Sequence, residues 1–123
     1  MPRKKIMVVD DEENLLFLLN KILESEGFDV ITADNGRECL ELLKKEKPDM
    51  ILLDMMMPGI TGIDVAEAIR SNPKTRNMKI IFLTVVKSNE IRKDRLKKIK
   101  ALDYIEKPFD NKDLVRRVKK IVC

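Results

Sequence analysis

The chain contains no histidine and no tryptophan, and only two cysteines among its 123 residues. The absence of histidine excludes imidazole as a general base, as a metal ligand and as a phosphorylated group within this chain. Cys39 falls in a helical pattern and Cys123 is the last residue, and two isolated cysteines form neither a disulfide framework nor a zinc site. No apolar run approaches the roughly 20 residues that span a bilayer. The first residues lead directly into a strand-like segment rather than a signal-peptide core, so we expect a cytoplasmic protein.

The composition is that of one soluble domain covering residues 1–123, with 44% hydrophobic and 37% charged residues. The net charge of +4 is unevenly distributed. Residues 1–86 carry 12 Lys and Arg against 15 Asp and Glu, whereas residues 87–123 carry 13 against 6. This basic third of the chain could face nucleic acid or an acidic protein surface, and a solvated helix face explains it at least as well.

The segment from Met50 to Gly62 organises the chain. Its apolar run, MILL, ends in Asp54 and is followed by the turn residues Pro58 and Gly59. Such a run is typical of a parallel strand buried on both faces, and open α/β sheets bind their ligands at the carboxyl ends of such strands. Taken alone, Asp54 is better explained as a residue that caps the following turn.

Further apolar runs at residues 5–10, 28–33, 79–84 and 104–106 predict four more strands. Helical patterns follow each strand, at about residues 11–23, 38–45, 64–70, 89–100 and 110–121. The alternation predicts an α/β fold, a doubly wound three-layer (βα)5 sandwich with a parallel sheet in the flavodoxin-like order 2-1-3-4-5. That order brings five polar residues from the ends of four strands to one edge of the sheet: Asp10, Asp11, Asp54, Thr84 and Lys107.

Three carboxylates in one small site repel each other and call for a cation among them. With only oxygen ligands, a hard ion is expected, Mg²⁺ by preference or Mn²⁺. A carboxylate beside such an ion and a lysine can attack phosphorus and form an aspartyl phosphate. Asp54 is the best nucleophile because it stands alone on the central strand, whereas the adjacent Asp10 and Asp11 suit metal binding.

Four motifs carry a family resemblance: VVDDE at 8–12, LLDMMMPGITG at 52–62, LT at 83–84 and DYIEKPF at 103–109. The chain resembles, over essentially its whole length, the receiver domains of two-component response regulators, which have the CheY-like version of this fold. The resemblance implies that Asp54 accepts a phosphoryl group from a sensor histidine kinase or a histidine phosphotransfer protein. It also implies a Mg²⁺ site of Asp10, Asp11, Asp54 and the Met56 backbone carbonyl. Lys107 would bind the phosphoryl group, Thr84 and Tyr104 would form the switch pair, and the bond before Pro108 would be cis.

A receiver of this kind is a phosphorylation-controlled binding module whose only chemistry is on itself, rather than an enzyme acting on outside substrates. Its fourth helix, fifth strand and fifth helix would bind an unknown downstream protein, as a monomer or as a phosphorylation-dependent dimer. Direct contact with nucleic acid or membrane is not expected. Two alternatives remain at this point: a small Mg²⁺-dependent phosphatase that uses Asp54, and a nucleic-acid-binding module that uses the basic third. Without the resemblance, Tyr104 would be interpreted as an ordinary half-buried strand aromatic.

The sequence departs from the family's usual pattern in two respects. The residue after the switch threonine is usually small, and Val85 is expected to crowd the phosphoryl site. Met56 and Val86 occupy positions that flank the phosphorylated aspartate, and both are apolar here. An attacking water would find few polar partners beside them, which predicts slow self-dephosphorylation.

Overall fold

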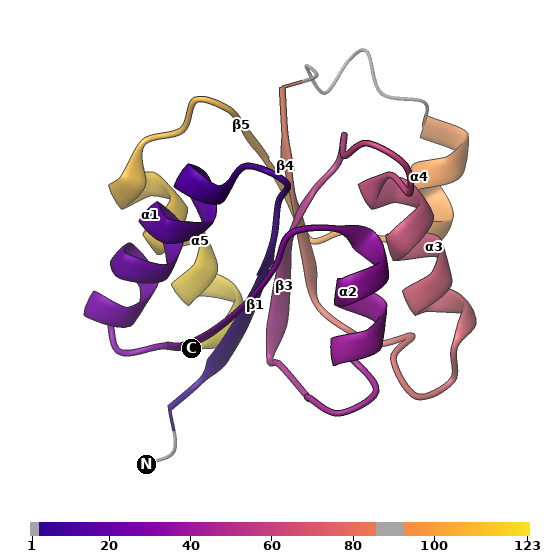
Figure 1. The fold of residues 1–123 in the computed structure, drawn as a ribbon, viewed down its shortest axis with the longest axis horizontal. Helices are drawn as coiled ribbons and strands as arrows, with labels where there is room; N and C mark the ends of the chain where they lie inside the picture. Colours follow the sequence, from indigo (N-terminus) through magenta and orange to yellow (C-terminus); the bar gives the residue numbers. More distant parts are fainter. Residues whose placement is uncertain (1–2, 86–92) are drawn as a thin grey trace.

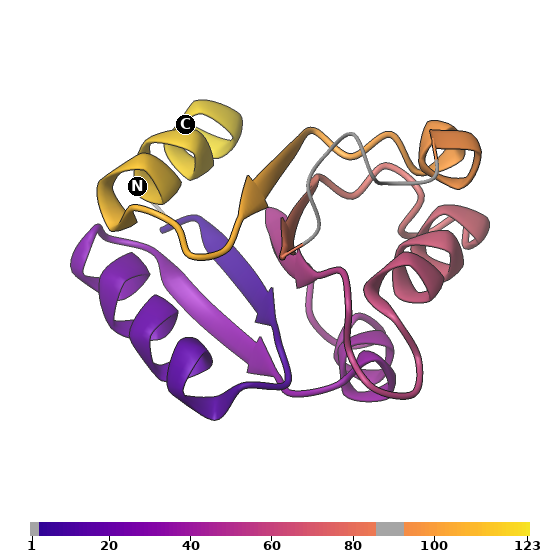
Figure 2. The same ribbon diagram turned by 90° about the horizontal axis from the view of Figure 1, so that it is seen from above.

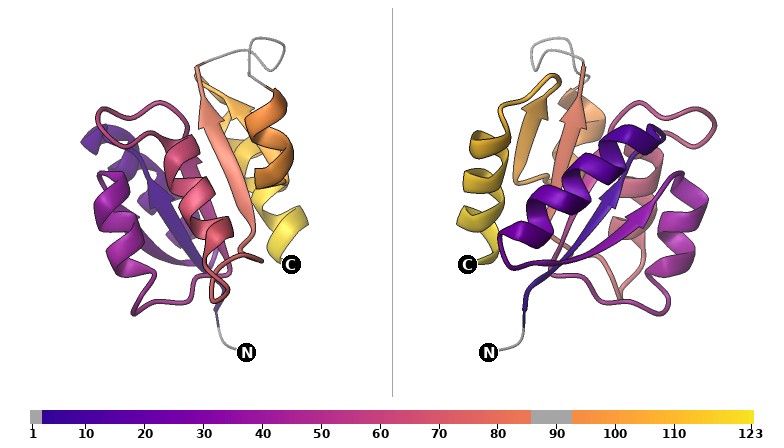
Figure 3. Two further views of the ribbon diagram at one scale, coloured as in Figure 1. Left: turned by 90° about the vertical axis from the view of Figure 1, so that its right-hand side faces the viewer. Right: turned by 60° about the vertical axis from the view of Figure 1, so that its left-hand side comes forward.

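Five parallel strands form one sheet in the order β2-β1-β3-β4-β5, which confirms the predicted topology (Figures 1 and 2). The computed structural model describes residues 3–85 and 93–123, without the side chains of residues 93–95. All residues of β3 and β4 are buried, as the unbroken apolar runs predicted. The carboxyl ends of the strands point to one edge of the molecule (Figure 3). The strands are β1 (Lys5–Val9), β2 (Asp29–Ala33), β3 (Met50–Asp54), β4 (Ile80–Thr84) and β5 (Asp103–Glu106).

Helices cover both faces of the sheet, so the predicted three-layer arrangement is also confirmed. Helices α1 and α5 lie on one face, and α2, α3 and α4 lie on the other (Figures 1 and 2). Among the described residues, no helix is long and apolar enough to cross a membrane. The helices are α1 (Glu13–Ser25), α2 (Gly36–Leu42), α3 (Gly62–Ser71), α4 (Lys93–Ile99) and α5 (Asn111–Val122).

Strand alternation sorts the core into two apolar layers, one on each side of the sheet. On β1, Met7 and Val9 pack with the α2–α4 layer, whereas Ile6 and Val8 pack with the α1–α5 layer. The same alternation divides the residues of β3, β4 and β5. It therefore also decides on which side of the sheet each polar residue at a strand end emerges.

Several helix boundaries differ from the predicted ones because capping side chains set them. Helix α2 begins at Gly36, two residues before the predicted start, because the Asn35 side chain accepts a hydrogen bond from the Glu38 N–H at 2.8 Å. Helix α3 begins at Gly62 because Thr61 and Asp64 form a reciprocal capping box. The described part of α4 begins at Lys93, and the residues predicted to begin this helix, 89–92, lie outside the described structure.

Arg70 joins α3 to the segments on either side of it in space. Its Nε donates to the Ile99 carbonyl at the end of α4, at 2.5 Å, and its Nη1 donates to the Met78 carbonyl before β4, at 2.7 Å. The partial burial of the guanidinium group lowers the pKa of Arg70. Arg70 thus holds the C-terminal end of α4 and the approach to β4 against α3.

Replacing Arg70 with methionine is expected to lower the free energy of unfolding by about 2 kcal/mol, because two partly buried carbonyls lose a charged donor. Chemical denaturation of the variant measures this loss. The exposed Arg76 on the neighbouring loop supplies the matched control, Arg76→Met. Equal losses in the two variants would contradict the structural role given to Arg70.

Candidate functional site

Alternation and register bring three charged side chains to the same side of the sheet edge. Asp10 lies two residues beyond Val8, Asp54 two residues beyond Leu52, and Lys107 two residues beyond Ile105, and all three preceding residues belong to the α1–α5 layer. Side chains two residues apart on a strand point to the same face. The parallel register, with Val9 opposite Leu53, ends β1 and β3 at nearly the same level. Strand geometry therefore directs the two carboxylates and the ammonium group towards one point.

The three aspartates predicted to converge do so. One carboxylate oxygen from each of Asp10, Asp11 and Asp54 lies within 4.8 Å of the others. Asp10 is fully buried and Asp54 is 4% exposed, whereas Asp11 faces solvent. The cluster therefore has a buried floor and an open side.

Lys107 supplies the cationic partner of this cluster. Its Nζ lies 2.7 Å from Asp10 Oδ2, 3.6 Å from Asp54 Oδ2 and 3.6 Å from Glu12 Oε1. Burial alone would lower the pKa of Lys107, but the hydrogen bond and charge of Asp10, with the charges of Asp54 and Glu12, outweigh it and raise that pKa. The Lys107 N–H donates to the Thr84 carbonyl at 2.8 Å, and the bond between Lys107 and Pro108 is cis.

Backbone groups fix the orientation of the two buried carboxylates. The Met56 N–H donates to Asp54 Oδ1 at 3.2 Å, and the Glu12 N–H donates to Asp10 Oδ1 at 2.9 Å. The Gly62 N–H donates to the Met55 carbonyl at 3.0 Å and closes the loop between β3 and α3. Each carboxylate thus keeps its second oxygen for Lys107 or for a ligand.

Electrostatic repulsion remains in this site despite Lys107. Burial of Asp54 and the negative charge of Asp10 raise its pKa from 3.8 to about 6, although Lys107 and the Met56 N–H act in the opposite direction. Asp10, Asp11, Glu12 and Asp54 bring four negative charges against the one positive charge of Lys107. The donor set consists of carboxylate oxygens, so the residues present fit a hard divalent cation, Mg²⁺ or Mn²⁺.

Thr84 and Tyr104 lie on the other side of the sheet from this cluster. Thr84 is fully buried and shares the α2–α4 side with Phe82, two residues before it. Tyr104 lies opposite Phe82 in the register and stacks on it, with ring centroids 5.7 Å apart. The Tyr104 ring is half-buried, and this burial raises the pKa of its phenol.

Two residues of the site were missed by sequence reasoning. Glu12 falls within the helix predicted from about residue 11, and its carboxylate lies 3.6 Å from Lys107 Nζ. Phe82 lies within the strand predicted at residues 79–84 and is the stacking partner of Tyr104. A register that aligns the ends of the fourth and fifth predicted strands would have identified the Phe82–Tyr104 pair, because it pairs Thr84 with Glu106.

The two departures from the usual pattern are placed only in part. Met56 and Val85 are 54% and 69% exposed, and each is within two residues of a strand end, Asp54 of β3 and Thr84 of β4. Val86 lies outside the described residues. The expected crowding by Val85 stays a prediction.

The fold and this acidic edge define a class of signalling module, and the comparison with known families gives the same answer. The model of the response regulator receiver domain family matches residues 6–119, so the chain belongs to this family. It is a receiver domain of a two-component response regulator. These matches favour the receiver interpretation over the phosphatase and the nucleic-acid-binding alternatives. Receiver domains of this type interact with histidine kinases and with downstream effectors.

Individual relatives agree with the family. The alkaline phosphatase synthesis transcriptional regulatory protein PhoP of Bacillus subtilis is 42% identical over 119 residues, covering 97% of this chain and 48% of that protein. The chain therefore spans about half the length of this relative. The chemotaxis protein CheY4 of Vibrio cholerae superposes with a TM-score of 0.90 at 29% identity, covering 98% of this chain and 99% of that chain. The response regulator TrrA of Thermotoga maritima, solved in complex with Mg²⁺–BeF, has a TM-score of 0.82 at 40% identity, covering 96% and 98% of the two chains.

Proposed function

We propose that Asp54 is the phosphoacceptor of this receiver domain and that its phosphodonor is a phosphohistidine of a sensor kinase or phosphotransfer protein. The observation that carries the proposal is a nearly buried carboxylate at the end of the central strand, with Asp10 and Lys107 beside it. A pKa of about 6 leaves Asp54 mostly ionised at neutral pH and able to act as a nucleophile.

The proposed reaction forms one bond and breaks one. An Asp54 carboxylate oxygen attacks the phosphorus while the bond from phosphorus to the donor imidazole nitrogen breaks, and the electron pair stays on that nitrogen, which takes up a proton. The Met56 N–H holds Asp54 Oδ1, and this leaves Oδ2 as the attacking atom. Lys107 Nζ, 3.6 Å from Oδ2, neutralises charge on the transferred group.

The acidic cluster gives Mg²⁺ a place in this proposal, with Mn²⁺ as a substitute. Asp10, Asp11, Asp54 and the Met56 backbone carbonyl would hold the ion, whose charge when bound offsets the carboxylates and attracts a phosphoryl oxygen. Among the described residues, only Lys107 pairs with Asp10, Glu12 and Asp54, and its single positive charge does not balance these acids, which favours a bound cation.

We assign the switch to Thr84 and Tyr104. Thr84 lies on the α2–α4 side at the last position of β4, so its hydroxyl would have to turn across the strand end to donate to an oxygen of the new phosphoryl group. The Tyr104 ring, which now stacks on Phe82, would then move into the space beneath β4. The output is then carried by α4, β5 and α5, which we propose as the binding face for a downstream protein, in a monomer or a phosphorylation-dependent dimer. We further propose residues 1–123 as one domain that acts in the cytoplasm and turns over no outside substrate.

Binding of fluoroberyllate, a phosphoryl mimic, tests the proposed site. Titration of the wild-type chain is expected to show one Mg²⁺-dependent site, which Asp54→Asn removes and Lys107→Met weakens by about tenfold or more, since a charged contact of about 1.5 kcal/mol is lost. Glu106→Gln, an exposed change at the neighbouring strand end, is the control. Tight binding that survives Asp54→Asn would refute the assignment. Rapid turnover of a generic phosphate ester would instead favour the phosphatase.

The apolar side chain of Met56 leads us to predict a long-lived aspartyl phosphate. Met56→Asn should shorten its lifetime, because an amide can hold the attacking water where a thioether cannot. Quenched samples of the phosphorylated protein, followed without a phosphatase, measure the rate. Loss of the phosphoryl group from the wild type within seconds would be incompatible with this prediction.

A further inference from the structure

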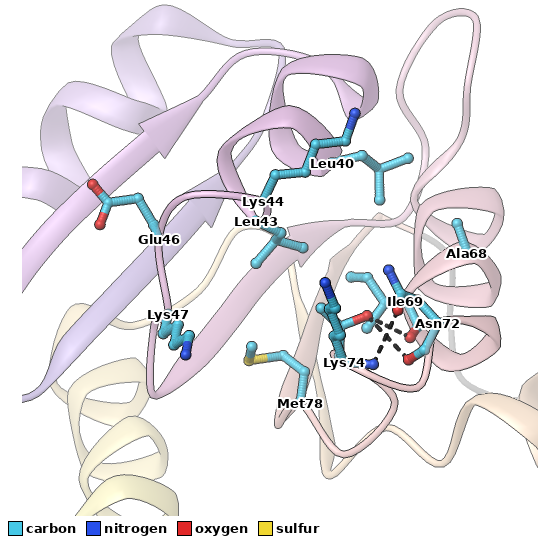
Figure 4. A pocket seen from close by; sticks show the side chains of 11 residues that line it. Leu40, Leu43, Lys44, Glu46, Lys47, Ala68, Ile69, Asn72, Lys74 and Met78 are labelled. Carbon is cyan, nitrogen blue, oxygen red and sulfur yellow. Dashed lines mark hydrogen bonds between the residues drawn. The ribbon is translucent and has the colours of Figure 1, made fainter.

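A groove lies at the opposite end of the sheet from Asp54. It has a volume of about 1050 Å³ and lies between the C-terminal parts of α2 and α3 and the loops that lead into β3 and β4 (Figure 4). Leu40, Leu43 and Met78 line it and are only half-buried, while the buried Ile69 lies behind them. The groove therefore presents apolar surface to solvent at a place that the phosphorylation chemistry does not use.

Positive charge surrounds this apolar floor. The one acid of the lining, Glu46, is engaged by Lys5 at 3.0 Å, and Lys5 is not part of the groove. Lys47 and Lys74 pair with no acid within residues 3–85 and 93–123. The ion pair between Lys44 and Glu41 is exposed, and such surface pairs contribute little to stability, so Lys44 can exchange this partner for another acid. Three lysines form the rim: Lys44, Lys47 and Lys74.

The loop that carries Lys74 is held in place by its own hydrogen bonds. Asn72 Oδ1 accepts from the Lys74 N–H at 3.0 Å, and Thr75 Oγ1 donates to the Ile69 carbonyl at 2.8 Å (Figure 4). Lys44 and Lys74 also follow the ends of α2 and α3, where a cation offsets the negative end of the helix dipole. The backbone of the loop at Lys74 is thus fixed before any partner arrives, which reduces the cost of ordering this loop on binding.

We propose that this groove docks an acidic amphipathic helix of a partner protein. The apolar side of such a helix would cover Leu40, Leu43 and Met78, and its flanking carboxylates would meet the three lysines. Helices and loops bound the groove, so no strand edge is offered for pairing with an extended peptide. A small ligand needs a site that encloses most of its surface. This apolar floor is open to solvent, so it suits a protein partner that is large enough to shield it from water.

This docking is independent of the proposed phosphorylation. The groove adjoins the segments before β3 and β4, whereas Asp54 and Thr84 are the last residues of those strands. A partner helix in the groove would leave the acidic edge and the α4–β5–α5 face accessible. The partner would therefore hold the domain in place while phosphotransfer proceeds.

The test is an NMR titration of the full chain with a synthetic helical peptide that has leucines at i, i+3, i+4 and i+7 and glutamates on both flanks. The expected result is a set of chemical-shift changes centred on Leu43 and Met78. The double variant Lys47→Glu/Lys74→Glu should lower the affinity for the peptide by about tenfold, which is the loss expected when two charge pairs at the rim are removed. Lys112→Glu/Lys120→Glu on α5 makes the same change of net charge at exposed positions and should have little effect. Asp54→Asn should bind the peptide as the wild type does, so a failure of the proposed phosphorylation would not affect this result.

Three outcomes would overturn the proposal. The first is no binding, or equal binding of a peptide in which lysines replace the glutamates. The second is a larger loss in the α5 variant, which would place the peptide on the basic C-terminal face. The third is tighter binding of dodecanoate at Leu43 and Met78, which would assign the groove to a small amphiphilic anion.

Discussion

Asp54→Asn is expected to stabilise the metal-free protein by about 2 kcal/mol at pH 8 and to change its stability little at pH 4. Burial and the charge of Asp10 raise the pKa of Asp54 from 3.8 to about 6, so folding disfavours its ionised form. This difference in pKa corresponds to at most roughly 3 kcal/mol. Asparagine keeps the shape and the acceptor for the Met56 N–H, and it removes the charge.

The direction of the pH dependence follows from the raised pKa. At a pH below 3.8 the carboxyl group is protonated in both the folded and the unfolded chain, and it carries no penalty. Between 3.8 and about 6 the unfolded chain loses its proton first, so the stability of the wild type falls as the pH rises. Above about pH 6 the folded protein bears the full cost of an ionised Asp54. Only at such a pH does Asp54→Asn give its full gain in the free energy of unfolding.

Denaturant unfolding of both proteins across this pH range, in the presence of a chelator, measures the effect. Glu106→Gln removes an exposed charge near the same edge and should give no such gain. Added Mg²⁺ should stabilise the wild type more than the variant, because the ion binds the carboxylate that the variant lacks. A variant that is less stable than the wild type at pH 8 without metal would show that Asp54 is not under electrostatic strain.

Gly62→Ala is expected to destabilise the domain by about 3 kcal/mol or more, against the usual trend for a helical position. Helix propensity alone favours alanine over glycine by about 1 kcal/mol. At Gly62, however, a Cβ would lie 2.0 Å from the Asp54 carbonyl oxygen and 2.8 Å from the Met55 Cα. Both neighbours are backbone atoms, so relief of the clash requires movement of the loop that presents Asp54.

Gly59→Ala on the same loop is the matched control. Gly59 has a φ of +77°, and apart from its own and the adjacent residues no atom of the described structure lies within 4 Å of the position that a Cβ would occupy. The cost of alanine there is therefore limited to about 1–2 kcal/mol of backbone strain. Thermal unfolding should rank the wild type above Gly59→Ala and Gly59→Ala above Gly62→Ala. Fluoroberyllate binding should weaken most in Gly62→Ala, since the clash falls on the residue that carries the acceptor. The reverse order of stability would mean that the loop between β3 and α3 can move to accommodate the Cβ added by Gly62→Ala without loss of stability, and it would contradict this account.

The parts of the fold that the sequence predicted are those governed by simple periodicity. The strands of a parallel sheet are buried on both faces, so runs such as MILL at 50–53 stand out in the sequence. The parallel sheet followed from the alternation of strands with helices, and its order was predicted as the usual one for a chain of this length. Helix ends were less accurate: the helical pattern predicted a start at about residue 38, whereas α2 begins at Gly36 because the Asn35 side chain caps it.

The candidate site divides in the same way. Asp10, Asp54 and Lys107 come at strand ends, and parallel strands end at one edge, so their convergence could be predicted. The contact between Glu12 and Lys107 could not, because it depends on side-chain direction at the start of α1. The stacking of Tyr104 on Phe82 depends on the register of β5 against β4, which sequence periodicity leaves open.

Intact-mass analysis of the chain with Mg²⁺ and an acyl phosphate as phosphodonor tests the central claim most directly. The wild type should gain the mass of one phosphoryl group, in a Mg²⁺-dependent and base-labile adduct, whereas Asp54→Asn should gain none. Glu106→Gln, treated in parallel, should be modified as the wild type is. An adduct that persists on Asp54→Asn, or a wild type that stays unmodified while binding Mg²⁺, would contradict the assignment of Asp54 as the phosphoacceptor.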